Sequence, residues 1–143
     1  MNLADGSLRP RLKLRPGAAS LLDLRRLYAG PCGVELVGDW QGDVERAVEA
    51  IAARLRDGAT IYGVNTGFGL LASVRIAPEQ LESLQLSIVR SHAAGTGAML
   101  PPHVVRLVLA LKAASLARGH SGVRTIVVER LLDCLNADIL PCI

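Results

Sequence analysis

The sequence predicts a mainly α-helical protein, and three features of its 143 residues indicate this class. Half of the residues are hydrophobic, the mean hydropathy is +0.34, and aromatic residues make up only 3%. A core built from aliphatic side chains favours packed helices over an aromatic-rich β-sandwich. Apolar residues also recur at helical spacing from Val44 to Leu55, and the segment 104–116 is apolar on nearly all sides.

The first expected elements are a flexible tail over residues 1–16 and one short helix. Ser20, followed three residues later by Asp23, is typical of a helix N-cap, and Gly30 with the proline after it ends this helix. Residues 34–37 form at most a short extended segment.

Two longer helices with a loop between them are predicted next. The first begins near Asp43 and stops at Gly58, a natural residue for the position after a helix. Residues 59–76 break the helical pattern with three glycines in a nearly uncharged run, which indicates a loop. Periodicity resumes at Pro78, a favourable first residue of a helix, and continues to about Ala94.

The last third of the chain predicts two more helices. Pro102 opens the first, whose apolar surface must be buried by other segments. Its polar residues are few: Arg106, Lys112 and Ser115. A turn over residues 119–122 then leads into a helix that ends near Asn136, with Ser121 as its expected N-cap.

Composition and charge limit the partners. The net charge is +3, but apart from a cluster of basic residues in the tail (Arg9, Arg11, Lys13, Arg15) the charges are dispersed and lack interleaved aromatics. We therefore expect a solvated or subunit-contacting tail and no nucleic-acid partner. No signal peptide and no apolar run of membrane-spanning length is visible, so a soluble, cytoplasmic protein without a membrane partner is expected.

The three cysteines are an odd number in no metal-ligand spacing, which indicates a reducing compartment and no metal site. We interpret residues 1–143 as a single N-terminal region of a larger fold.

One segment in the loop carries candidate chemistry. It comprises Tyr62, Gly63, Val64, Asn65, Thr66, Gly67, Phe68 and Gly69. Its glycines permit positive φ while polar side chains project, and a tyrosine there can accept a proton if neighbours adjust its usual pKa near 10. On spacing alone, a glycine-rich turn anchored by Tyr62 and Phe68 stays open as an alternative. A phosphate loop is disfavoured because no Gly-Lys-Ser/Thr follows.

Read as a whole, this octapeptide resembles the signature loop of the histidine, phenylalanine and tyrosine ammonia-lyases and related aminomutases. Residues 59–97, 109–124 and 135–141 are also similar to that family, in the same order, so that the resemblance covers about residues 16–143. It implies a helical fold that corresponds to the N-terminal region and the start of the central helical bundle of these enzymes.

The resemblance also implies roles for the site residues. Tyr62 corresponds to the catalytic base or proton-handling residue, and the rest of the loop (Gly63, Asn65, Thr66, Gly67, Phe68, Gly69) supports it. The pair Ser91-His92 is similar to that of the histidine-specific members and implies substrate binding, whereas a lone histidine near a helix end is more often a capping residue. The implied reaction is the elimination of ammonia from L-histidine to give urocanate, in a homotetramer.

The family's electrophile is a methylidene-imidazolone formed autocatalytically from Ala-Ser-Gly. No such triplet occurs here. Ala72-Ser73 is followed by Val74, and the triplet would be expected shortly after Ile143. We therefore expect the 143-residue chain to be inactive by itself.

Two other interpretations stay open: a non-catalytic remnant or interaction module, and part of a phenylalanine or tyrosine ammonia-lyase or aminomutase. Ala114 and Arg90 depart from the family pattern, in which asparagine and an apolar residue are usual.

Overall fold

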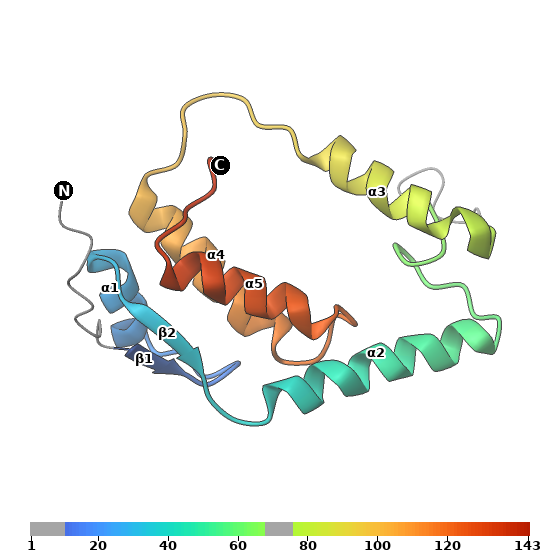
Figure 1. The fold of residues 1–143 in the computed structure, drawn as a ribbon, viewed down its shortest axis with the longest axis horizontal. Helices are drawn as coiled ribbons and strands as arrows, with labels where there is room; N and C mark the ends of the chain where they lie inside the picture. Colours follow the sequence, from blue (N-terminus) through green and yellow to red (C-terminus); the bar gives the residue numbers. More distant parts are fainter. Residues whose placement is uncertain (1–10, 68–75) are drawn as a thin grey trace. The chain divides into compact units, whose positions relative to one another are not determined.

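The computed structural model describes residues 11–67 and 76–143 and divides the chain into two compact units. The first unit comprises Met1–Ala50 and Met99–Ile143, and the second comprises Ile51–Ala98. Helices predominate in both, as Figure 1 shows, which confirms the predicted fold class.

The first unit opens with a parallel pair of strands. Strand β1 (Arg11–Leu14) pairs with β2 (Gly33–Leu36), and helix α1 (Leu21–Ala29) lies in the connection between them. Parallel strands need such a crossover, because their ends point the same way.

The expected flexible tail is wrong for its last part. Leu12 and Leu14 alternate with exposed residues along β1 and enter the hydrophobic core with relative exposures of 8% and 2%. Burial of these two leucines fixes the strand against the rest of the unit.

Helix α1 begins as its capping pair predicts. The Asp23 backbone N–H donates to the Ser20 hydroxyl oxygen at 3.2 Å, and the Ser20 N–H donates to the Asp23 carboxylate at 3.0 Å. Each residue thereby satisfies a backbone donor that the helix itself leaves unpaired. Leu27 on this helix is fully buried.

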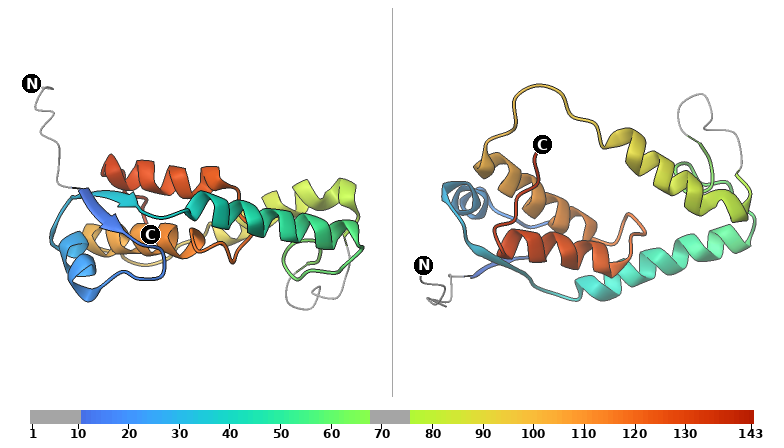
Figure 2. Two further views of the ribbon diagram at one scale, coloured as in Figure 1. Left: turned by 90° about the horizontal axis from the view of Figure 1, so that it is seen from below. Right: turned by 45° about the horizontal axis from the view of Figure 1, so that its top comes forward.

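Helices α4 (Pro102–Leu116) and α5 (Thr125–Asn136) are antiparallel and lie side by side, as Figures 1 and 2 show. Together they supply much of the core. Helix α4 also contacts α1, and α5 contacts β2. The side chain of Asn136 binds the edge of β2: its Oδ1 accepts from the Val34 N–H at 2.6 Å, and its Nδ2 donates to the Val34 carbonyl at 3.1 Å.

The apolar helix α4 is buried on one face. Its alanines 110 and 113 are almost fully enclosed, whereas Val108 and Leu111 are 40% and 46% exposed. Arg106 is 95% buried, with a relative exposure of 5%, and its guanidinium binds the Asp138 carboxylate at 2.9 Å. The sequence pattern marks Arg106 as polar but does not reveal this ion pair.

The turn before α5 differs from the expected cap. Arg124, and not Ser121, is the N-cap residue, and it makes no side-chain capping bond. Gly119 has φ +71°, and a Cβ there would overlap the backbone carbonyl of Asp43.

The second unit contains the end of α2 (Trp40–Arg56) and helix α3 (Leu81–His92). Helix α2 ends in a Schellman motif, in which the N–H of Gly58 donates to the Leu55 carbonyl and that of Ala59 to the Arg54 carbonyl. The predicted stop at Gly58, which has φ +78°, is thus confirmed. The helix predicted from Pro78 to about Ala94 begins as the short 3₁₀ turn η2 (Pro78–Gln80) and ends at His92.

Candidate functional site

Asn65 holds the candidate loop in shape. Its side chain is buried, with a relative exposure of 4%. The Nδ2 group donates to the Ala59 carbonyl at 2.9 Å, and Oδ1 accepts from the Ile61 N–H at 2.7 Å. One amide therefore joins the start of the loop to its middle, and its polar atoms are engaged in structure.

Thr66 braces the next part of the loop. It is fully buried, and its hydroxyl accepts from the Gly63 N–H at 3.2 Å while it donates to the Gly67 carbonyl at 3.0 Å. Gly63 has φ +72°, in the left-handed region that glycine adopts without strain.

The loop presents Tyr62 at its surface. The tyrosine side chain is 63% exposed, although it stands three residues before the buried Asn65. Within this loop the buried polar side chains shape the backbone, whereas the tyrosine side chain is largely exposed. Phe68 and Gly69, also predicted to support the site, lie outside the described residues.

Helix α3 touches this loop through Gln85. Its side-chain Nε2 lies 3.2 Å from the Gly63 carbonyl oxygen and 3.4 Å from that of Val64. Sequence reasoning does not single out Gln85 as a site residue. The available signal is its place two helical turns before His92 on the same helix.

Ser91 and His92 meet at the end of α3. The Ser91 hydroxyl lies 3.0 Å from the Ile88 carbonyl oxygen and 3.1 Å from His92 Nδ1, which itself lies 2.8 Å from that carbonyl. Because a carbonyl oxygen only accepts, we assign a proton to Nδ1. In the tautomer with this single ring proton, Nε2 is the acceptor of the imidazole.

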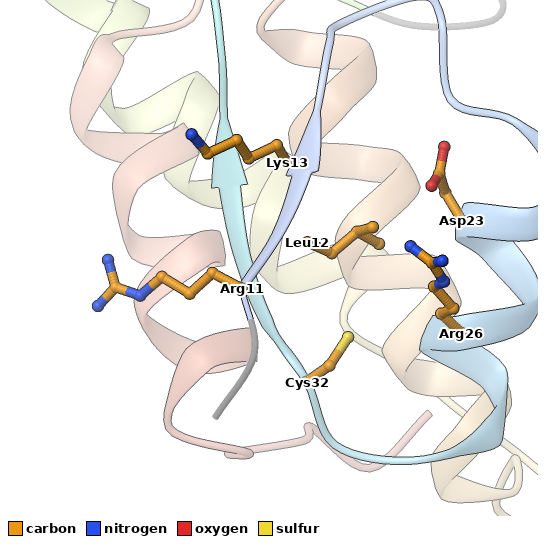
Figure 3. A pocket seen from close by; sticks show the side chains of 6 residues that line it. All are labelled: Arg11, Leu12, Lys13, Asp23, Arg26 and Cys32. Atoms are coloured by element: carbon orange, nitrogen blue, oxygen red, sulfur yellow. The ribbon is translucent and has the colours of Figure 1, made fainter. Parts of the chain in front are cut away.

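A pocket of about 610 Å³ lies in the first unit. Figure 3 shows Leu12 pointing toward α1, whereas Arg11 and Lys13 extend to the other side of β1. Burial raises the pKa of the Cys32 thiol, although Arg106 and Arg26 act in the opposite direction, so this cysteine is not an activated thiolate. The pocket is lined by Arg11, Leu12, Lys13, Asp23, Arg26 and Cys32. None of these is a predicted site residue.

Two further properties of the described residues bear on the site. No cluster of three or more His, Cys, Asp or Glu side chains suited to a metal ion occurs within residues 11–67 and 76–143. In the same part of the chain, none of the helices has the length and apolar character needed to cross a membrane.

The helical fold and the glycine-rich loop that carries Tyr62 fit a known family of enzymes. The family model described as "Aromatic amino acid lyase" matches residues 19–143, and the chain belongs to this family. The predicted resemblance is thus confirmed.

The curated relatives make the assignment more specific. The chain is 44% identical over 133 residues to the histidine ammonia-lyase of Desulfotalea psychrophila and 45% identical over 132 residues to that of Vibrio vulnificus. These matches cover 93% and 92% of the chain but 26% of each relative. The chain therefore spans about a quarter of the length of the curated relatives it matches.

Solved structures of the same family share the fold. The histidine ammonia-lyase of Trypanosoma cruzi is 34% identical with a TM-score of 0.73, over 89% of this chain and 24% of that one. A tyrosine aminomutase from Streptomyces globisporus is 29% identical with a TM-score of 0.85, over 94% of this chain and 25% of that one.

Proposed function

We propose that this chain is the Tyr62-bearing part of an ammonia-lyase that converts L-histidine to urocanate. The observation that carries the proposal is the braced loop, in which Asn65 and Thr66 are buried while Tyr62 is 63% exposed. The identity of 44–46% to histidine ammonia-lyases over more than nine tenths of the chain supports the substrate.

The proposed reaction is an elimination. The amino group leaves from Cα, a proton leaves from Cβ, and a carbon–carbon double bond forms between them, so that histidine yields urocanate and ammonia. A group must accept the Cβ proton in the transition state. Tyr62 is the proposed acceptor, because the loop holds its backbone firmly and leaves the side chain accessible.

His92 and Ser91 are the proposed substrate-binding residues. With the proton on Nδ1, the His92 ring can accept a hydrogen bond from the N–H of a substrate imidazole. A hydrophobic residue at this position makes no such bond, which is a physical basis for selecting histidine over phenylalanine.

The electrophile implied by the family, a methylidene-imidazolone, requires an Ala-Ser-Gly triplet that these 143 residues do not contain. It supplies an electron sink for the leaving amine when present. The described residues show no cradle for it, so Tyr62, Ser91 and His92 are assigned to proton transfer and substrate binding alone. Assembly into a homotetramer belongs to the same proposal.

A second candidate is an aromatic aminomutase, which the TM-score of 0.85 to the tyrosine aminomutase favours. The two functions differ in product, since a lyase releases an unsaturated acid and an aminomutase releases a β-amino acid.

The test uses a hybrid in which this chain replaces the matching quarter of the Vibrio vulnificus histidine ammonia-lyase. We expect urocanate from histidine with the hybrid and none from the 143-residue chain alone. Tyr62→Phe should lower kcat by about 10²–10⁴-fold, the usual contribution of a general base, with an unchanged circular dichroism spectrum. Tyr28→Phe removes the same atom from an exposed tyrosine on α1 and should leave kcat unchanged.

Three results would count against the proposal. They are near-normal turnover of the Tyr62→Phe hybrid, a β-amino acid as the main product, and urocanate from the purified 143-residue chain.

A further inference from the structure

We infer that Gln85 is a positioning residue for Tyr62, because it attaches the backbone that follows the tyrosine to helix α3. This inference rests on the proposed role of Tyr62 in proton transfer. It concerns a residue that does not itself touch substrate in the proposal but fixes the place from which Tyr62 acts.

The contacts of Gln85 are with the two peptide units that directly follow Tyr62. Its side-chain nitrogen lies 3.2 Å from the Gly63 carbonyl oxygen and 3.4 Å from the Val64 carbonyl oxygen. Both partners are acceptors, so the amide nitrogen must face them and donate. Gly63 has φ +72°, where glycine is conformationally permissive, so a hydrogen bond to its carbonyl restricts this part of the backbone.

The other braces of the loop act differently. The hydrogen bonds of Asn65 reach Ala59 and Ile61, and those of Thr66 reach Gly63 and Gly67, so that all of them run within the loop. They determine the shape of the loop. The hydrogen bonds of Gln85 run from α3 to the loop and determine where that shape stands relative to the helix.

The position of Gln85 on α3 connects the two predicted parts of the site. Gln85 and His92 are seven residues apart and share one face of the helix, about 10 Å apart along its axis. A loop fixed at Gln85 is thereby fixed relative to His92. Displacement of a reacting group by about 1 Å can lower a rate roughly 10²-fold.

Gln85→Glu in the hybrid enzyme tests the attachment. The carboxylate has nearly the size of the amide but no donor, and it places negative charge against two carbonyl oxygens. We expect kcat to fall by about 10–10²-fold and KM for histidine to change by less than about twofold, since misplacing the base leaves ground-state binding intact. The matched control is Gln80→Glu, because Gln80 is exposed, precedes α3 and makes no side-chain capping bond.

A double-mutant cycle separates positioning from general stability. If Gln85 acts through Tyr62, Gln85→Glu should reduce kcat much less in the Tyr62→Phe background than in the unmodified hybrid. An equal loss in both backgrounds would overturn the inference.

Hydrogen exchange of the 143-residue chain keeps the two proposals distinguishable. The amides of Gly63, Val64 and Asn65 donate to oxygens of the loop, and Gln85→Glu should raise their exchange rates while Gln80→Glu does not. Unchanged exchange refutes the positioning role. If exchange rises but Tyr62→Phe leaves kcat normal, the attachment stands and the proposed function of Tyr62 fails.

Discussion

Under the proposed function, the proton on Nδ1 of His92 leaves Nε2 as the atom that recognises a substrate donor. The amide of His92→Gln reaches the position of Nε2, that of His92→Asn reaches only the position of Nδ1, and His92→Leu places no acceptor at either. In the hybrid enzyme we expect the ratio of kcat/KM for histidine to that for tyrosine to fall about 10–10²-fold for Leu, since an unpaired polar group costs about 1–3 kcal/mol.

The Asn variant should resemble Leu in this ratio, and the Gln variant should retain more of the histidine preference. A ratio that stays the same in all three variants would show that His92 does not determine selectivity.

The cap of α1 predicts a pH dependence. Hydrogen bonds from the Ser20 hydroxyl and backbone N–H hold the pKa of Asp23 below its ordinary value of 3.8. A carboxylate with a lowered pKa contributes stability above the unfolded value, and this contribution is lost as the pH falls through the folded value. The first turn of α1 should therefore fray only below about pH 4.

The measurement is an NMR titration of the Ser20 amide. We expect its chemical shift to change below the titration range of free aspartate. A midpoint at or above 3.8 would contradict the capping role, and Asp23→Asn should abolish the transition.

At the scale of single residues, the sequence predicts the loop better than the direction of its side chains. The loop pattern predicts that polar side chains project, and Tyr62 is exposed. Asn65 and Thr66 instead turn inward, which the pattern does not predict, because a glycine-rich run allows many backbone paths. Gln85 is missed because its acceptors are carbonyl groups more than 20 residues away, which leave no pattern in side-chain types.

Among the elements, the turn between α4 and α5 depends on one glycine. Gly119→Ala should lower the free energy of unfolding by about 1–3 kcal/mol from backbone strain alone, because φ is +71° there. Overlap of the new Cβ with the Asp43 carbonyl adds to this loss. Gly30→Ala is the control, since Gly30 has φ 170° and open space around its Cβ position.

Urea denaturation of both variants measures the difference in midpoint. Equal midpoints for Gly119→Ala and Gly30→Ala would show that the approach of the turn to α2 is not required for stability.

Local sequence signals predict where helices begin and end, but they do not predict pairing between segments that are distant in the sequence. The Ser20–Asp23 cap and the Gly58 stop are confirmed, because each depends on atoms within a few residues. Strand β1 is missed, because four alternating residues beside basic charges look like a solvated tail. Its burial depends on β2, 22 positions further along.

Over the whole molecule, long-range contacts decide which apolar surfaces are covered. The bond from Asn136 to Val34 joins positions 102 residues apart and ties α5 to the sheet. The periodicity of α4 shows that it is apolar all round, but it cannot show which face the neighbouring elements cover.

The uncovered part of α4 predicts self-association of the 143-residue chain. Val108 and Leu111 lie three residues apart on one face and are 40% and 46% exposed. Full burial of such a side chain is worth about 1.5–3 kcal/mol, so covering the exposed parts of both against another copy is favourable. We expect a sedimentation coefficient that rises with concentration, together with binding of a hydrophobic dye.

Replacing both Val108 and Leu111 with Gln, a good helix former, should lower both signals and leave the helix content intact. The same pair of replacements at Leu21 and Leu22, which are 78% and 59% exposed on α1, should have a smaller effect if α4 is the contact face. If the chain stays monomeric at all concentrations and binds no dye, the exposed residues of α4 do not form a surface for self-association.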